Sequence, residues 1–306
     1  YVASANCALY CGAQIDFVDI DPLTWNISPD LLEEKLKSAK KTGKIPKVLV
    51  IVHLAGNPCD LKRIYELSKE YNFSIIEDAS HALGSKYSGK LIGSGEFSDL
   101  TILSFHAVKN ITTAEGGMVL TNDRKLFEKL ELLRSHGVTR DTKKMTNKDE
   151  GLWYYEQLLL GFNFRMSEIH AALGISQMKS LDKFITKRNE IAQIYIDKLK
   201  DLPVNVQTIR KEDYSAWHIF VIHLKFEQIE RSRLEIFNLL RSKGIGVNVH
   251  YIPVHLQPFY QKLGFKRGDF PNSENYYDGA ITIPMFTKLQ EKEIELVIES
   301  LKESAQ

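Results

Sequence analysis

Long hydrophobic runs are missing from this sequence of 306 residues. The longest apolar stretch, residues 48–55, is interrupted by His53, whereas a helix needs roughly 20 apolar residues to span a bilayer. Cysteine is also scarce, with three residues in the chain. A small, odd number of cysteines in a long chain excludes a disulfide framework and favours a reducing compartment. We therefore expect a cytoplasmic protein without a membrane-spanning helix.

An excess of charge of one sign is absent as well. Forty Lys and Arg residues balance 39 Asp and Glu residues, which leaves a formal net charge of +1. Such a balance gives no overall attraction to nucleic acid or to an anionic membrane. With 43% hydrophobic and 10% aromatic residues, the composition is that of a globular protein and excludes intrinsic disorder. We expect the partner to be a small molecule or a second copy of the chain.

The first 125 residues alternate helical and strand patterns, which predicts βα units and a largely parallel sheet. The chain opens at Tyr1 and runs directly into this pattern, so we expect its start to lie upstream. The predicted helices cover residues 2–11, 28–39 and 61–70, and the predicted strands cover residues 14–18, 48–52, 73–76, 100–105 and 117–120.

The pattern changes after residue 123. A polar run at 140–150 predicts a solvated loop, with a cover over the site as the alternative, and one long helix is expected over 167–199. Residues 200–203 give the domain boundary, with a large domain at 1–199 and a smaller α+β domain at 200–306. The small domain is predicted to contain a strand at 219–224 and helices at 232–242 and 289–301.

Two polar clusters follow the ends of apolar strands, where open parallel sheets place their ligands. The first contains Asp78 and His81, and the second contains Ser104 and Lys109. Lys109 stands among small and apolar residues, so desolvation is expected to lower its pKa and to free a neutral amine. Asp78 is placed to keep a pyridine nitrogen protonated, which pyridoxal phosphate chemistry requires. Solvated loop residues are the alternative reading of both.

The combined pattern resembles the pyridoxal-phosphate-dependent sugar aminotransferases of the DegT/StrS type, which have the aspartate aminotransferase fold, known as fold type I. The motifs that carry the resemblance are Asp78-x-x-His81, Ser104-Phe105-His106-x-x-Lys109 and Glu115-Gly116-Gly117. The resemblance extends through Gly161–Ile169 to the C-terminal helix. It implies an α/β fold with a mostly parallel central sheet and a smaller C-terminal α+β domain.

The resemblance also implies roles for individual residues. Lys109 is expected to bind the cofactor covalently and Asp78 to pair with its pyridine nitrogen. His81 is expected beside the phenolic oxygen, although a buried structural histidine is the alternative, and Ser104 is expected at the phosphate. Asn163 matches a residue that reaches the partner's cofactor phosphate in a homodimer with shared sites. Tyr1 matches an aromatic residue that stacks on the cofactor ring.

One departure from the family pattern concerns the start of the chain. Family members carry some seventy or more further residues there, including a Gly/Ser/Thr-rich turn that binds the cofactor phosphate. We therefore expect the chain to lack part of its large domain. Whether it binds cofactor without that turn is an open question at this point, and an inert fragment is one alternative.

The expected substrates are an amino-acid donor, glutamate by resemblance, and a nucleotide-linked 4-keto-6-deoxy sugar, with UDP as the nucleotide. Residues 153–156, 161–166 and 248–258 resemble the pseudaminic acid branch of the family. Interface packing is the equal alternative for Trp153, Tyr154 and Tyr155. Another keto sugar, or a non-catalytic sensor that binds the cofactor, stays open.

No metal site is predicted. Cys7 and Cys11 have a helical spacing of four residues, but no paired histidines or further cysteines stand near them in the sequence. Buried thiols are the favoured interpretation of both.

Overall fold

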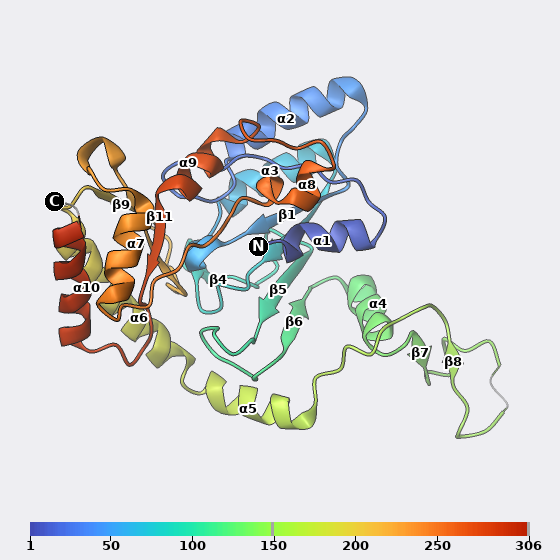
Figure 1. Cartoon of the computed structure of the whole chain (residues 1–306). Helices are drawn as coiled ribbons and strands as arrows, with labels where there is room; N and C mark the ends of the chain where they lie inside the picture. The colour runs from blue at the N-terminus through green and yellow to red at the C-terminus, as the bar shows by residue number, and fades with distance from the viewer. Residues whose placement is uncertain (148–149, 305–306) are drawn as a thin grey trace.

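The computed structural model describes residues 1–147 and 150–304, and its elements are labelled in Figure 1. The helices are α1 (Ala3–Tyr10), α2 (Pro29–Thr42), α3 (Leu61–Tyr71), α4 (Arg124–Arg134), α5 (Glu168–Met178), α6 (Leu181–Leu199), α7 (Arg233–Ser242), α8 (Pro258–Gln261), α9 (Pro271–Gly279) and α10 (Glu291–Ser304). The strands are β1 (Val48–Val52), β2 (Ser74–Asp78), β3 (Lys86–Tyr87), β4 (Lys90–Leu91), β5 (Leu100–Ser104), β6 (Gly117–Leu120), β7 (Val138–Thr139), β8 (Glu156–Gln157), β9 (Val204–Val206), β10 (Phe220–Leu224) and β11 (Ala280–Ile283).

Local sequence signals explain where the early helices begin. The Ser28 side chain accepts a hydrogen bond from the Leu31 N–H, and Pro29 occupies the first turn of α2. Asp60 accepts in the same way at the start of α3. Both residues satisfy a backbone N–H that has no partner within the helix. The predicted starts of these two helices are confirmed.

The central sheet has the strand order β1-β2-β5-β6. Strands β1, β2 and β5 run parallel, and β6 runs antiparallel to β5. The predicted sheet, mostly parallel within an α/β fold, is therefore confirmed. Parallel strands end at the same edge of a sheet, so the segments that follow β2 and β5 are brought together there.

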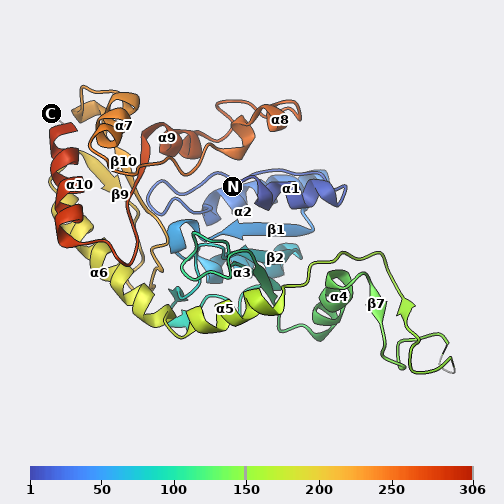
Figure 2. The same cartoon turned by 60° about the horizontal axis from the view of Figure 1, so that its bottom comes forward.

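Two elements predicted from the sequence are wrong. Residues 14–18, all of them described, form no strand, because a strand needs a partner and the nearby backbone makes only the isolated bridge between Ile20 and Ile27. The long helix expected over 167–199 is interrupted at Lys179 and Ser180, so α5 and α6 are separate helices. Figure 2 shows how α5 and α6 run from the central sheet to the C-terminal group of elements.

Buried apolar side chains form two main cores. One lies between α2, α3 and the central sheet and includes Leu36, Ile64 and Ile75. The other lies between α7, α10 and the antiparallel sheet β11-β10-β9. Helix α6 contributes to both, since Ile185 belongs to the first core and Ile191 to the second. The division into a domain at 1–199 and a domain at 200–306 stays a prediction. Residues 305 and 306 of the second domain lie outside the described part.

Within residues 1–147 and 150–304, no helix is long and apolar enough to cross a membrane. The same residues contain no group of three or more His, Cys, Asp or Glu side chains arranged to hold a metal ion.

Candidate active site

The two predicted polar clusters meet at one edge of the central sheet. Asp78 is the last residue of β2, and Ser104 is the last residue of β5. The register pairs Asp78 with Ile102, so Asp78 and Ser104 project from the same face of the parallel pair. Lys109 follows in a tight turn in which its backbone N–H donates to the His106 carbonyl oxygen at 3.0 Å. The fold thus brings Asp78, Ser104 and Lys109 to one edge.

Asp78 is half-buried and both of its oxygens accept hydrogen bonds. The Ser4 hydroxyl on α1 donates to Oδ2 at 2.6 Å, and the Ser80 backbone N–H donates to Oδ1 at 3.1 Å. Burial by itself would raise the pKa of Asp78, but these hydrogen bonds outweigh it and hold the pKa below its ordinary value. Asp78 is therefore a carboxylate at neutral pH.

Lys109 is half-buried beside Asp78. Burial lowers the pKa of the Lys109 ammonium below its ordinary value, and the charge of Asp78 partly offsets that effect. A lysine with a lowered pKa holds a larger fraction of the neutral amine, which is the form that attacks a carbonyl.

His81 is buried, with 7% of its surface exposed. Its Nδ1 accepts a hydrogen bond from the Ala55 N–H at 3.3 Å, and its Nε2 lies 3.4 Å from the Tyr251 hydroxyl. Burial and the nearby Lys109 lower the pKa of His81 to about 3. The imidazole is therefore neutral, and because Nδ1 accepts, its proton is on Nε2.

Tyr1 joins the same group through aromatic contacts. Its ring centroid lies 5.9 Å from that of Tyr251, whose ring stacks on His81 at 6.3 Å. Burial and the neighbouring Tyr1 raise the pKa of Tyr251 to about 12, so its hydroxyl keeps its proton. The Tyr1 ring is exposed and borders the edge where Asp78 and Lys109 lie.

Asn163 is the predicted site residue that the fold of one chain places elsewhere. It lies on residues 135–147 and 150–164, called the arm below, which extend away from the central sheet between α4 and α5 (Figures 1 and 2). Its backbone bridges to Ser135, and its side chain is exposed. A role for Asn163 at the predicted site of the same chain has no support in this geometry, and its contribution to a partner stays a prediction.

The site contains residues that the sequence did not single out individually. Tyr251 lies within 248–258, a segment predicted as a whole to contact the substrate. Ser4 bonds to Asp78 from α1, and His218 lies with its ring 4.4 Å from that of His81. No local pattern marks Ser4 or His218, because each reaches the site through a long-range contact.

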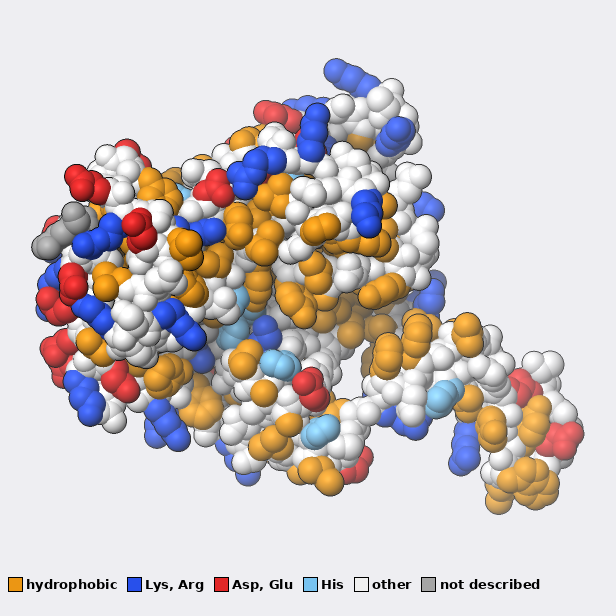
Figure 3. Space-filling view, viewed as in Figure 1, with side chains coloured by type: hydrophobic (Ala, Val, Ile, Leu, Met, Phe, Trp, Pro, Cys, Tyr) orange, Lys and Arg blue, Asp and Glu red, His pale blue; other side chains and the backbone are white. Residues whose placement is uncertain are grey.

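Aromatic residues of the arm and two cysteines in and just after α1 lie at the surface. Trp153 and Tyr155 are exposed on the arm, so they line neither the site nor an interface within the described part of one chain. Figure 3 shows hydrophobic side chains gathered on the projecting arm. Cys7 and Cys11 are exposed rather than buried, because α1 turns this side to the solvent. Of the polar run at 140–150, Lys148 and Asp149 lie outside the described residues.

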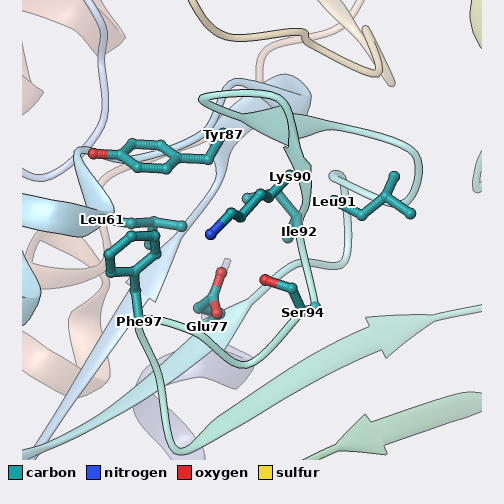
Figure 4. A pocket seen from close by; sticks show the side chains of 9 residues that line it. Leu61, Glu77, Tyr87, Lys90, Leu91, Ile92, Ser94 and Phe97 are labelled. Atoms are coloured by element: carbon teal, nitrogen blue, oxygen red, sulfur yellow. The ribbon is translucent and has the colours of Figure 1, made fainter.

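A small pocket lies on the opposite face of the sheet. Glu77 precedes Asp78 in β2 and points to the other side, where Tyr87 and Phe97 form part of the pocket wall (Figure 4). The buried His53 donates from Nε2 to Glu77 at 2.8 Å, since its Nδ1 accepts from the Cys59 N–H. This pair links the ends of β1 and β2 on the face of the sheet that is opposite to Lys109.

The sequence is similar to a known protein family over nearly its whole length. The model of the DegT/DnrJ/EryC1/StrS aminotransferase family matches residues 1–302. A Campylobacter jejuni protein named UDP-4-amino-4,6-dideoxy-N-acetyl-β-L-altrosamine transaminase is 39% identical over 305 residues, which cover 98% of this chain and 76% of that protein.

Solved structures are similar as well. PseC of Helicobacter pylori, an aminotransferase involved in the biosynthesis of pseudaminic acid, aligns with a TM-score of 0.87 and 33% identity over all of this chain and 77% of its own. The pyridoxal phosphate form of a Streptococcus pneumoniae protein described as a sugar aminotransferase aligns at 0.86 and 29% identity, over all of this chain and 78% of its own. The chain therefore belongs to the DegT/DnrJ/EryC1/StrS family and is a pyridoxal-phosphate-dependent aminotransferase of fold type I.

Proposed function

We propose that this aminotransferase converts the 4-keto group of a UDP-linked 6-deoxy sugar into an amine, with glutamate as the amino donor. The observation that carries the proposal is that Asp78, at the end of β2, lies beside Lys109, in the turn that follows β5, and that both are partly shielded from water. The sugar is assigned from the name of the Campylobacter jejuni relative. The product fits the biosynthesis of pseudaminic acid.

The residues present fit pyridoxal phosphate. Asp78 is ionised by its hydrogen bonds and has the charge that a protonated pyridine nitrogen needs. Ser104 offers a hydroxyl for the phosphate, the neutral His81 lies beside the ring position, and Tyr1 offers an aromatic face. When bound, the cofactor supplies an electron sink and carries the amino group between the two substrates.

Lys109 has two tasks in this proposal. Its neutral Nζ binds the cofactor covalently at rest, which the lowered pKa favours. With the amino donor bound, Nζ would move a proton from the donor's Cα to the cofactor, and the donor would leave as a 2-oxo acid. In the second half-reaction, Nζ would move a proton from the cofactor to C4 of the sugar, where the amino group carried by the cofactor replaces the keto oxygen, which leaves as water.

The segment 248–258 supports a sugar substrate at this edge. His250 and Tyr251 lie beside His81, and the His250 imidazole is held through Nδ1 at 2.8 Å from the Thr282 hydroxyl. Burial lowers the pKa of His250, with Lys109 contributing, so it is a neutral hydrogen-bonding group. Such flat polar rings suit the faces and hydroxyls of a sugar.

We further propose a homodimer in which each arm completes the partner's site. The arm exposes Phe162 and Phe164, whose rings stack at 4.7 Å, on both sides of Asn163. Exposed aromatic groups around a polar side chain are typical of an interface. In a two-fold dimer both arms make the same contact, so Asn163 would reach the partner's cofactor phosphate.

A cytoplasmic location completes the proposal. Cys7, Cys11 and Cys59 are all free thiols, and two of them are exposed. Exposed free thiols persist in a reducing compartment.

The proposal is tested with the purified protein and pyridoxal phosphate. Borohydride reduction followed by peptide mass analysis should place the pyridoxyl group on Lys109. With glutamate as donor, kcat/KM for the UDP-linked 4-keto-6-deoxy sugar should exceed that for the GDP-linked analogue. Label on another lysine alone would overturn the site, and a preference for the GDP sugar would overturn the substrate. Labelled protein without turnover of either sugar would favour a non-catalytic sensor.

A further inference from the structure

The backbone of residues 215–218 is held in place by parts of the chain that are distant in sequence. The Ala216 N–H donates to the Ser85 hydroxyl at 3.0 Å, and the His218 N–H donates to the Ala55 carbonyl oxygen at 2.8 Å. The Gly56 backbone packs so closely against Ala216 that a Cβ added at Gly56 would lie 3.1 Å from the Ala216 nitrogen. The segment therefore has little freedom to shift.

This segment also contains a strained backbone conformation and contacts a buried arginine. Trp217 is a buried aromatic residue with a φ of +43°, a region that bulky side chains avoid. The buried Arg188 donates from Nη1 to the carbonyl oxygens of Trp217 at 2.9 Å and His218 at 3.0 Å. Its Nε has no hydrogen-bond partner among the described residues. A strained residue and a buried cation are unfavourable unless the surrounding structure enforces them, and such features cluster at functional sites.

The side chain that this segment positions is the imidazole of His218. Its Nδ1 lies 3.2 Å from Oδ1 of Asn110. The amide nitrogen of Asn110 donates to the carbonyl oxygens of Leu83 at 3.4 Å and Ala216 at 3.5 Å, which fixes the orientation of the amide. Because the amide oxygen only accepts, the proton of His218 must be on Nδ1. Asn110 follows Lys109 directly in the chain.

The other side of the same imidazole packs against His81. The two ring centroids lie 4.4 Å apart at an angle of 43°. Burial lowers the pKa of His218 well below its ordinary value, and the neighbouring His81, Lys109, Arg188 and His250 lower it further. Two neutral rings pack at this distance without the repulsion that two imidazolium ions would cause.

We propose that His218 is a positioning residue for the reaction: through its hydrogen bond to Asn110 it holds the turn that presents Lys109, while its ring packs against His81. His218 belongs to the C-terminal half, so it also ties the reacting lysine to that half of the molecule. The inference rests on the proposed role of Lys109 as the cofactor lysine.

Two substitutions at position 218 separate hydrogen bonding from ring packing. His218→Phe keeps a ring against His81 but removes the N–H, whereas His218→Asn keeps a donor near the place of Nδ1 but removes the ring. We expect His218→Phe to lower kcat by about 10- to 100-fold with small changes in KM, as displacement of a reacting group does. His218→Asn should recover most of that loss. Circular dichroism must show that both variants are folded.

A spectroscopic readout separates positioning from a purely structural role. The pH at which the absorbance of the bound cofactor changes reports the proton on its linkage to the lysine. His218→Phe should shift this midpoint by about half a pH unit or more, and His218→Asn should stay near the parent. Asn110→Leu should reproduce the effect of His218→Phe. The double variant should be no worse than either single one, because the two residues act through one hydrogen bond.

A measurement without cofactor tests the geometry itself. In the apo protein, nitrogen-15 shifts of the imidazoles should show His218 protonated on Nδ1 and His81 on Nε2 between pH 5 and 8. The opposite tautomer of His218 would overturn the hydrogen bond to Asn110.

Failure of this inference can be distinguished from failure of the proposed function. If borohydride labels Lys109 in the parent while His218→Phe keeps the parent's kcat and absorbance midpoint, the inference is wrong and the function stands. If the parent itself is not labelled on Lys109, the proposed site is wrong and the inference falls with it.

Discussion

The strand-end site and the arm both contain aromatic and polar side chains, but those at the strand ends are largely buried and those on the arm are exposed. At the strand ends, His81 is 7% exposed and Asp78 accepts two hydrogen bonds from the same chain. On the arm, Trp153 is 76% exposed and Phe164 is 72% exposed, on either side of Asn163 along the chain. In the first region the polar groups are hydrogen-bonded within one chain, whereas in the second the apolar groups are exposed in the described part of one chain. Motifs of equal strength in a sequence can thus differ in whether the same chain buries their side chains.

The largest expected effect is at the reacting lysine. Lys109→Ala should abolish turnover, because covalent binding and proton transfer both depend on its Nζ. The protein should stay folded, since the half-buried side chain contributes little packing. Single-turnover assays with each substrate measure the loss. Lys292→Ala, an exposed lysine of α10, is the matched control and should keep the parent's rate. Residual turnover close to the parent's would remove Lys109 from the mechanism.

The next largest effect is expected at Asp78. Asp78→Asn should lower kcat by roughly 10²- to 10³-fold while the cofactor still binds, because a neutral amide stabilises a protonated pyridine nitrogen poorly. Steady-state kinetics and the absorbance of the bound cofactor report the two quantities separately. Asp278→Asn, at an exposed position, controls for loss of one negative charge. A variant that transaminated at the parent's rate would require another acid.

The arm is tested by complementation between inactive chains. Asn163→Ala alone should lower activity by weakening the hold on the partner's cofactor phosphate. When it is mixed with the Lys109→Ala chain, each heterodimer should regain one intact site, with Lys109 from one chain and Asn163 from the other. Differently tagged chains verify that subunits exchange. Tagged heterodimers that stay as inactive as their parents would show that the arm does not complete a partner's site.

The smallest expected effect is on stability in acid. His81 has a folded pKa of about 3 against an unfolded value of about 6.5. The contribution of the neutral His81 to the free energy of unfolding is therefore fully present above pH 6.5 and is lost as the pH falls from 6.5 toward 3. The loss reaches at most about 1.4 kcal/mol per pH unit.

Urea unfolding at pH 7, 5.5 and 4.5 measures this slope. His81→Asn should make the free energy of unfolding less dependent on pH in this range. His136→Asn, on the exposed arm, should leave the dependence unchanged. Equal slopes for His81→Asn and the parent would mean that the buried ring is not kept neutral.

Much of the large domain could be predicted from the sequence, because its signals are local. Ser28 with Pro29 and Asp60 mark two helix starts within a few residues, and the apolar run at 48–52 gives β1. Asp78 and Lys109 could be assigned to one site because parallel strands end at a common edge. The strand expected at 14–18 failed because no neighbouring strand pairs with it, which is not a local property.

The sequence by itself predicted most of the helices and strands, since periodicity and caps act over short separations, and its resemblance to a known family singled out Asp78 and Lys109. Only the tertiary structure decided how those residues are held. Ser4 reaches Asp78 across 74 positions, and His218 reaches Asn110 across 108. Such contacts depend on how the whole chain packs. The cost of closing a loop rises only slowly with its length, so the sequence between two residues does not indicate whether they meet. The same packing buries His81 and leaves Asn163 exposed on the arm.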